Sequence, residues 1–500
     1  MRLRLLSKCK RGGNGSMGTR PNVLMISVDE LGRNHMEIGG DTVSRMPTLR
    51  FLAEHGQQFD NCYSECPVCI PARRSLMTGL TPRTHGDRIY NDTLRMPEVT
   101  TLAQAFRNGG YQAYCVGKLH VYPQRDRIGF DDAQIIEEGR YEFGETDDYQ
   151  RWLGEQGFVG QEFMHGMGNN IYYTHPWHLP DYTHPTNWTT QKMCETIKRR
   201  DPTRPAFYYV SYQFPHPPLV PLSSYMDEFR NEKLPDPLCG DWVTDEGIIG
   251  EMIEKSAEYT EKEKAEARKA YYAQCQHIDH QIRILIGTLR ECQMLDNTLI
   301  VFLSDHGDML FDHKLVAKRS FYEASGNIPM ILSGPVIAAK AGQTDHRLCC
   351  LADVMPTLLE LCGLPVPESV EGISMESETK RQYLYGEVGE GRKATRMLRD
   401  ADYKLIYYPN GNVSQLFDMH TDRAELKDLA KLPEYRDVLS RMEQELIRHL
   451  YGEDLKWVKD HKLVGQDFGT PPQKADYGLY NQRGYHWSSP RGYSNIGKNA

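Results

Sequence analysis

Four uninterrupted apolar runs of strand length are spaced along the chain, and longer segments with helical periodicity separate them. Continuous apolar runs of about 4 to 8 residues are typical of strands that are buried on both faces of a parallel sheet. The clearest predicted helix is an amphipathic stretch over residues 262–292. Strands that alternate with helices predict an α/β fold, a mostly parallel sheet flanked by helices. The runs are residues 22–29, 206–214, 297–305 and 328–334.

Three of these predicted strands end in side chains that can carry chemistry. Asp29 and Glu30 close the first strand, His216 follows the second, and Asp305 with His306 closes the third. Ligands of open α/β sheets bind outside the carboxyl ends of the strands. We therefore expect these side chains to converge at one edge of the sheet.

Two regions lack the alternation of strands and helices. Residues 131–205 are rich in aromatic residues, histidine and proline and show little periodicity, which predicts an elaborated loop region that shapes a substrate pocket. Beyond residue 370, short strand-like pieces and one helix near 433–451 predict a smaller C-terminal α+β subdomain. The predicted organisation is a disordered leader (1–19), a large α/β domain (20–370), a C-terminal sheet-and-helix subdomain (371–460) and an irregular tail (461–500).

Composition narrows the range of partners and compartments. The 59 Lys and Arg against 68 Asp and Glu give a formal net charge of -9, so no nucleic-acid partner is predicted. No window approaches the roughly 18 to 20 apolar residues of a membrane span, so no membrane association is predicted. The basic segment 1–19 lacks the apolar core of a secretory signal. Twelve scattered cysteines without framework spacing favour reduced thiols and a cytoplasmic protein.

The most informative segment is Cys69-Ile-Pro-Ala-Arg73, which continues to a hydrophobic-Thr-Gly ending at Gly79. Taken alone, it is also compatible with a buried cysteine ahead of a helix. The Cys66-x-x-Cys69 spacing lacks the second pair of ligands that a structural zinc site needs. The segment resembles the signature of the type I, formylglycine-dependent sulfatases of the alkaline phosphatase superfamily. In that family the cysteine at this position is oxidised to formylglycine.

Five other short segments match the same family in the same order. The resemblance extends over about residues 20 to 370 and implies an alkaline-phosphatase-like fold with a catalytic domain of that extent. Several independent matches in one order are far more specific than any one of them. The segments are SVDELG (27–32), GKLH (117–120), PHPP from Pro215, LSDHGDML (303–310) and AKRSFYE (317–323).

The resemblance implies a divalent metal, calcium, with Mg²⁺ or Mn²⁺ as alternatives. Its ligands would be Asp29, Glu30, Asp305, His306 and the modified Cys69. Mainly oxygen donors suit Ca²⁺ or Mg²⁺ better than a metal that prefers thiolate. Glu30 departs from the pattern of many relatives, which have aspartate there, and its longer arm changes the ligand geometry.

The resemblance also implies roles for the remaining polar residues. A hydrated aldehyde at position 69 would attack the sulfur of a sulfate ester, with Arg73 and Lys118 as fixed positive charges. Lys318 and His216 would meet the leaving oxygen, one donating the proton and the other polarising the ester. His120 would then deprotonate the second hydroxyl, so that the aldehyde re-forms and sulfate is expelled.

The predicted substrate is a small-molecule or saccharide sulfate ester, with aryl, choline and carbohydrate sulfates all open. The predicted protein partner is a formylglycine-generating maturation enzyme. A homo-oligomer, in which the tail would wrap a neighbouring subunit, is a further alternative. Two alternatives remain: a phosphonate monoester or phosphodiester hydrolase of the same superfamily, and a sulfatase-fold binding protein without catalysis. Lys118 and His120 favour the sulfatase, because related phosphonate hydrolases lack that pair.

Two other patterns are interpreted as structural. GMGNN at 166–170 is a lone Gly-x-Gly with no strand before it, so it is not a dinucleotide-binding loop. His277 and His280 lie three residues apart on the predicted helix 262–292, without a third ligand for a metal. We expect both histidines on an exposed face of that helix.

Overall fold

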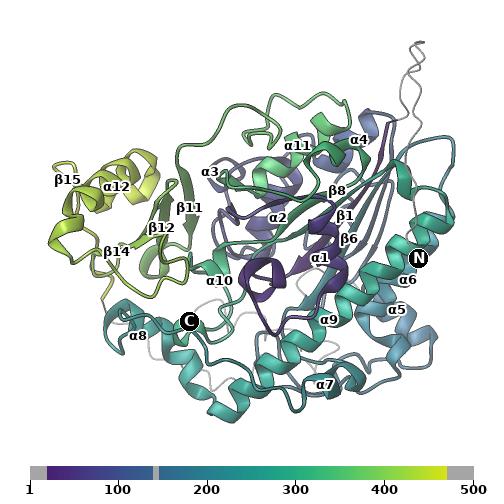
Figure 1. The fold of residues 1–500 in the computed structure, drawn as a ribbon, viewed down its shortest axis with the longest axis horizontal. Coiled ribbons are helices and arrows are strands. Elements are labelled where there is room, and N and C mark those ends of the chain that lie inside the picture. The colour runs from purple at the N-terminus through teal and green to yellow at the C-terminus, as the bar shows by residue number, and fades with distance from the viewer. Residues whose placement is uncertain (1–19, 139–145, 470–500) are drawn as a thin grey trace, which may run out of the picture.

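The computed structural model describes residues 20–138 and 146–469, and an eight-stranded sheet forms its centre (Figure 1). Neighbouring strands run parallel except at β8, which is antiparallel to both of its neighbours. This mostly parallel sheet confirms the predicted fold class. In spatial order the strands are β5 (Asp132–Ile135), β4 (Gln112–Gly117), β6 (Ala206–Pro215), β1 (Asn22–Asp29), β7 (Thr298–Ser304), β8 (Met330–Ser333), β2 (Gln57–Phe59) and β9 (Gln343–Asp345).

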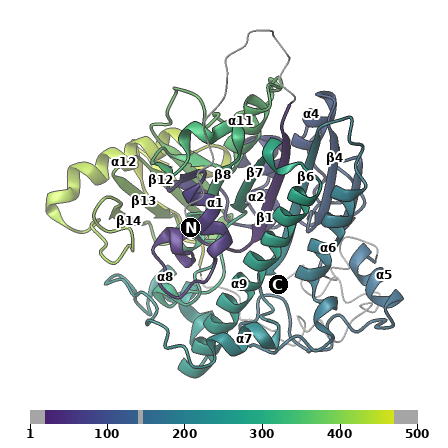
Figure 2. The same ribbon diagram turned by 45° about the vertical axis from the view of Figure 1, so that its right-hand side comes forward.

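The central strands are buried on both faces because apolar residues follow one another without interruption. In β1, Leu24 and Ile26 belong to one hydrophobic core and Val23 and Met25 to another, as the two-residue repeat of a strand requires. Helices cover both faces of the sheet (Figure 2). The first core is covered by α6 (Pro185–Lys198) and α9 (Glu261–Glu291), and the second by α2 (Cys69–Thr78), α4 (Leu102–Asn108) and α11 (Val354–Leu361).

The predicted helix at 262–292 is confirmed as α9, which begins at a capping box formed by Thr260 and Glu263. The prediction that His277 lies on an exposed face is wrong. Its side chain is buried, and its Nε2 lies 2.8 Å from the Oδ1 of Asn187 on α6. His280 is half-buried, with Nδ1 3.0 Å from the hydroxyl of Tyr225. Both histidines face neighbouring helices because α9 is packed along α6 and α7 (Ser223–Phe229).

The described parts of the predicted loop region 131–205, which are residues 131–138 and 146–205, contain more regular structure than predicted. They contain β5, α5 (Asp148–Glu155) and α6. Part of the aromatic content is core rather than pocket lining, since Tyr149 and Trp188 are fully buried and their rings meet edge to face at 5.5 Å. A helix as short as α5, with eight residues, carries too few turns for a clear periodic signal.

The predicted C-terminal α+β subdomain is confirmed. Alternate residues of its third strand face opposite sides, Leu405 and Tyr407 toward α12 and Ile406 and Tyr408 toward the large domain. This antiparallel sheet therefore has one face for its own helix and one for the junction. Its elements are β11 (Leu384–Val388), β12 (Thr395–Arg399), β13 (Tyr403–Tyr408), β14 (Val413–Asp418) and α12 (Arg436–His449), followed by a hairpin of β15 (Val458–Lys459) and β16 (Lys462–Leu463).

The predicted leader, and the predicted tail beyond residue 469, lie outside the described residues. Within residues 20–138 and 146–469, no helix is long and apolar enough to span a membrane. The α-helices and strands not yet named in the described residues are α1 (Pro47–Glu54), α3 (Pro82–His85), α8 (Gly247–Ile253), α10 (Glu323–Gly326) and a two-stranded pair, β3 (Cys62–Tyr63) with β10 (Cys349–Cys350). Short 3-10 helices connect several of these elements.

Candidate active site

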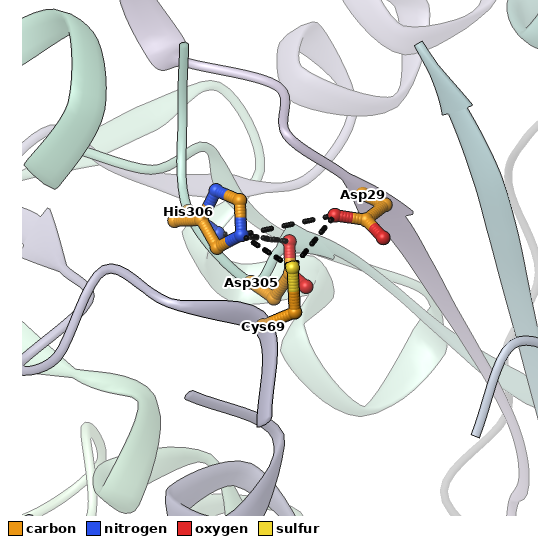
Figure 3. A group of neighbouring side chains, drawn as sticks. All are labelled: Asp29, Cys69, Asp305 and His306. Carbon is orange, nitrogen blue, oxygen red and sulfur yellow. Dashed lines mark hydrogen bonds and ion pairs between the residues drawn. The ribbon is translucent and has the colours of Figure 1, made fainter. Parts of the chain in front are cut away.

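The carboxyl ends of the central strands bring four buried side chains together (Figure 3). Asp29 is the last residue of β1, Asp305 and His306 follow β7, and Cys69 is the first residue of α2. One potential ligand atom from each of these four residues lies within 4.8 Å of the others. The expected convergence is therefore present, and the first residue of α2 joins it.

Cys69 contacts two other members of this group. Its Sγ is 3.2 Å from Nε2 of His306 and 3.8 Å from Oδ1 of Asp29. Burial and the neighbouring Asp29 raise the pKa of the Cys69 thiol, so the neutral thiol is favoured. An unmodified, neutral cysteine here is a poor thiolate nucleophile.

Arg73 lies one helical turn beyond Cys69 and points to the same site. Its Nε donates to Oδ2 of Asp305 at 3.0 Å, and its Nη1 donates to the hydroxyl of Ser211 at 2.8 Å. Burial works against the Asp305 carboxylate, but His306 and Arg73 outweigh it and lower the pKa of Asp305. Asp305 is thus held ionised, and Arg73 is held as a fixed positive charge.

Lys118 and His120 lie just past the end of β4. Lys118 Nζ is hydrogen-bonded to Oδ2 of Asp29 and donates to Oε1 of Glu138 at 2.7 Å. His120 has a left-handed backbone with φ of 61°, and its N–H donates to Oε1 of Glu137 at 2.8 Å. The imidazole Nε2 of His120 is 3.4 Å from the hydroxyl of Tyr90. The carboxylate of Glu138 therefore holds the side chain of Lys118, and the carboxylate of Glu137 holds the backbone of His120.

Lys318, His216 and Glu30 form the other side of the site. Lys318 Nζ lies 2.6 Å from Nε2 of His216 and donates to Oε2 of Glu30 at 3.0 Å. Burial and the Lys318 charge hold the pKa of His216 well below its ordinary range. Burial opposes the Lys318 cation, but Cys69 and Glu30 outweigh it and raise the pKa of Lys318. In this pair, lysine carries the proton and the imidazole is neutral.

The donor set fits a hard divalent cation. Asp29, Asp305 and His306 bring mainly carboxylate oxygens to the side chain of residue 69. Glu30 is oriented toward Lys318 and His216, and it forms a second candidate group with Asp29 and His216. Among the described residues, Glu30 Oε1 is buried without a hydrogen-bond partner. Burial raises the pKa of Glu30 to about 8, which a bound cation would reverse.

All ten residues singled out from the sequence lie in or beside this one cluster, which also contains residues that sequence reasoning missed. Glu137 and Glu138 follow β5 directly, so the strand-end rule that identified Asp29 would have identified them had β5 been predicted. Asn170 had been set aside with GMGNN, yet its Oδ1 accepts from Lys318 at 3.2 Å. No local signal marks this last contact.

The chain is similar to known proteins over most of its length. Residues 21–364 match the family model described as Sulfatase, and residues 311–451 match one described as N-sulphoglucosamine sulphohydrolase, C-terminal. An arylsulfatase of Clostridium perfringens is 32% identical over 469 residues, which cover 89% of this chain and 97% of the relative. A choline-sulfatase of Rhizobium meliloti is 30% identical and covers 83% of each chain.

Solved structures agree in fold. The phosphonate monoester hydrolase of Agrobacterium radiobacter has a TM-score of 0.75 at 21% identity, covering 89% of this chain and all of that one. A protein solved with its substrate D-glucosamine-2-N,6-O-disulfate has a TM-score of 0.69 at 21% identity, covering 86% and 97%. With the family-model match, which spans the strand ends and Cys69, these likenesses confirm the resemblance read from the signature: the chain belongs to the sulfatase family of the alkaline phosphatase superfamily and is a sulfatase.

Proposed function

We propose that the protein hydrolyses an aryl or carbohydrate sulfate ester and releases inorganic sulfate, with a formylglycine made from Cys69 and a divalent metal. The observation that carries the proposal is the place of Cys69, 3.2 Å from His306 and 3.8 Å from Asp29 inside a group of buried ligand atoms. The aryl class rests on the arylsulfatase relative, and the carbohydrate class on the glucosamine disulfate ligand of the structural neighbour.

Asp29, Asp305, His306 and the modified residue 69 would hold the metal, with Glu30 as the nearest further carboxylate. Calcium is the proposed ion, and Mg²⁺ or Mn²⁺ would suit the same oxygens. When bound, the metal would supply Lewis-acid polarisation, and the aldehyde side chain would supply an oxygen nucleophile that thiol chemistry lacks. A formylglycine-generating maturation enzyme is the partner that this chemistry requires.

The cations of the chain would bind and orient the sulfate group. Arg73 is bound to Asp305, Lys118 to Asp29, and Lys318 to Glu30 and His216, so all three cations border the group around position 69. A sulfate monoester is an anion, and the alcohol gains negative charge as the S–O bond breaks. Fixed positive charges in a buried site stabilise that charge more strongly than they would in water.

Proton transfer divides between Lys318 and two histidines. His216 Nδ1 lies 2.6 Å from the carbonyl oxygen of Pro217, so Nδ1 carries hydrogen and Nε2 is free to accept from Lys318. Lys318 is therefore the proposed proton donor to the leaving oxygen, and His216 orients it. His120 is the proposed base for the step that releases sulfate, with Tyr90 against its Nε2.

The second candidate is phosphonate monoester or phosphodiester hydrolysis. It is favoured by the TM-score of 0.75 to a phosphonate monoester hydrolase, which exceeds the 0.69 of the protein bound to a disulfated sugar. The GKLH segment weighs against it by family resemblance. Parallel turnover of a phenyl sulfate and a phenyl phosphonate monoester would decide between them, since each candidate predicts the higher kcat/KM for its own ester.

Mass spectrometry of the tryptic fragment that contains Cys69 is the direct test, paired with turnover of 4-nitrophenyl sulfate. Protein made with a maturation enzyme should show the thiol-to-aldehyde mass change and turn over the sulfate. Cys69→Ala should lose turnover, whereas Cys66→Ala, a nearby buried cysteine, should keep it. An unmodified thiol with no turnover, in a host that modifies a control sulfatase, would sink the formylglycine mechanism and favour a binding protein.

A further inference from the structure

The GMGNN segment at 166–170 reaches the catalytic site from the insertion between β5 and α6. Its Asn169 is buried, and Nδ2 donates to Oε2 of Glu138 at 3.3 Å. Through its other oxygen, Glu138 accepts from Lys118 at 2.7 Å. The next residue, Asn170, accepts from Lys318 at 3.2 Å. Asn169 thus contacts a hydrogen-bond partner of Lys118, and Asn170 contacts Lys318 itself.

The surrounding contacts fasten this segment to the loop that carries Lys318. Tyr172 donates its hydroxyl to Oδ2 of Asp308 at 2.6 Å. Asp308 in turn accepts from the N–H of Ala317, the residue before Lys318, at 3.0 Å. Asn170 has a left-handed backbone with φ of 63°, a conformation that asparagine adopts more readily than most residues. The segment and the Lys318 loop are therefore held in one fixed arrangement.

Lys318 has three N–H donors, and three acceptors surround them: Glu30 Oε2, His216 Nε2 and Asn170 Oδ1. Three acceptors define the direction of an ammonium group, whereas two leave it free to swing. Asn170 differs from Glu30 because an amide oxygen orients the ammonium without neutralising its charge. That difference matters in a site whose substrate is an anion.

We propose that Asn170 is a positioning residue, which holds the Lys318 ammonium toward the leaving oxygen of the sulfate ester. The inference rests on the proposed function, because it assigns Lys318 the role of proton donor there. As the S–O bond breaks, its electron pair goes to the alcohol oxygen. That oxygen takes the place of His216 Nε2 as acceptor of one Lys318 N–H, and the proton moves to it. Glu30 and Asn170 keep the other two N–H groups. Asn170 makes no bond to the reacting atoms and acts through the lysine.

The test compares leaving groups in mature enzyme and in Asn170→Ala. Phenol is a poorer leaving group than 4-nitrophenol, so phenyl sulfate needs proton donation more than 4-nitrophenyl sulfate does. A misplaced donor should lower kcat for phenyl sulfate by about 100-fold and for 4-nitrophenyl sulfate by less than about 10-fold, with KM nearly unchanged. A merely structural residue would lower both rates equally.

Asn170→Asp keeps the acceptor and adds a charge. It should retain the parental leaving-group dependence while raising KM for both esters, because a second carboxylate at Lys318 repels the anionic substrate. If Asn170→Ala does not fold, this variant decides alone, and a leaving-group dependence steeper than that of the parent would overturn the inference. Asn412→Ala is the matched control, since Asn412 also has a left-handed backbone, with φ of 51°, and lies in the turn between β13 and β14 of the C-terminal subdomain.

The outcomes separate the two proposals. An active parent whose Asn170→Ala variant loses both substrates equally, or neither, overturns the positioning role and leaves the proposed function intact. A correctly matured parent that turns over no sulfate ester overturns both. A selective loss for phenyl sulfate, with Asn412→Ala unchanged, supports the inference.

Discussion

The active site and the junction with the C-terminal sheet both bury clusters of charged side chains, but they balance charge differently. At the junction, the buried Arg396 forms a two-pronged ion pair with Asp454, with Nε–Oδ2 and Nη2–Oδ1 distances of 2.7 and 3.0 Å. Arg88 shares that aspartate and also donates to Glu387 at 3.0 Å. We call these four residues the junction network. Arg88 also contacts the exposed Glu390 at 3.2 Å, but among buried carboxylates the network matches two cations with two.

The active site has no such match among the described residues. Around Arg73, Lys118 and Lys318 lie four carboxylates, those of Asp29, Glu30, Glu138 and Asp305. One oxygen of Glu30 is buried without a partner there, and burial raises the pKa of Glu30 to about 8. The buried charges of the junction network are paired within the network, whereas the active site has one more carboxylate than cations, which a bound metal ion would balance.

This contrast separates stability from function. Removing one partner of a buried ion pair leaves the other charge buried without a counter-charge, which destabilises the fold. Removing a carboxylate from a crowded site relieves repulsion and costs activity instead. Each variant below changes one region and reports on both properties.

The largest effect is expected for Asp29→Asn, which removes an active-site charge and keeps the side-chain shape. Asp29 lies between Lys118 and Cys69 in the candidate metal group. kcat/KM for an aryl sulfate should fall by about 10²- to 10³-fold or more, the size of effect that follows loss of one preorganised electrostatic group. Turnover measured beside thermal unfolding checks this. Retention of most of the parental activity would contradict the active-site assignment.

Asp279→Asn is the matched control for that variant. Asp279 is equally buried, and it accepts the backbone N–H groups of Thr48 and Leu49 at 3.1 and 2.8 Å. Because hydrogen bonds to a charged group are lost there, stability should fall by about 1.5 to 3 kcal/mol. Its kcat/KM should stay at the parental value, since the residue caps α1 and lies outside the site.

Arg396→Ala should show the reverse pattern. It leaves Asp454 buried beside only Arg88, so the free energy of unfolding should fall by about 3 to 5 kcal/mol. The kcat of the folded fraction should not change. Denaturant unfolding checks the first result and turnover at low temperature the second. Arg441→Ala is the control, because its pair with Asp400 is half-exposed and such pairs contribute about 0 to 1 kcal/mol. If Arg396→Ala and Arg441→Ala had the same free energy of unfolding, the stabilising role of the junction network would be contradicted.

The smallest effect is a pH dependence that sharpens the contrast. Since the folded pKa of Glu30, about 8, exceeds its ordinary 4.5, the folded state binds more protons between these values. Stability of chelator-treated protein should therefore fall as pH rises from about 6.5 to 8. Buried histidines such as His184, whose pKa burial lowers to about 3, still take up protons on unfolding near pH 6.5, but they do so in a Glu30 variant as in the parent and cancel in the comparison.

Glu30→Gln should flatten that slope in urea unfolding at the two pH values. Other buried carboxyls with raised pKa values, Glu65 and Glu425 at about 7, are common to both proteins and cancel. Added Ca²⁺ should raise the free energy of unfolding of the parental protein by about 2.7 kcal/mol when the Ca²⁺ concentration is about one hundred times Kd. Identical slopes in parent and variant would show that Glu30 is not the uncompensated charge.

Much of the large sheet could be predicted from the sequence, because a strand buried on both faces leaves a local mark of consecutive apolar residues. β1, β6, β7 and β8 were all predicted in this way. β4 and β5 were missed, since QAYCVG and DAQI are short and mix polar with apolar residues. The helix α9 has enough turns to be periodic, whereas α5 does not.

The sequence by itself determined the strand ends that carry Asp29, Asp305 and His306 and the helix start that carries Cys69, because each is a local pattern. Only the tertiary structure decided that Asn170 meets Lys318, 148 residues away, and that Arg88 meets Asp454, 366 residues away. It also decided that His277 is buried. Contacts across such separations depend on how layers pack, and no period of two or of 3.6 residues encodes that packing.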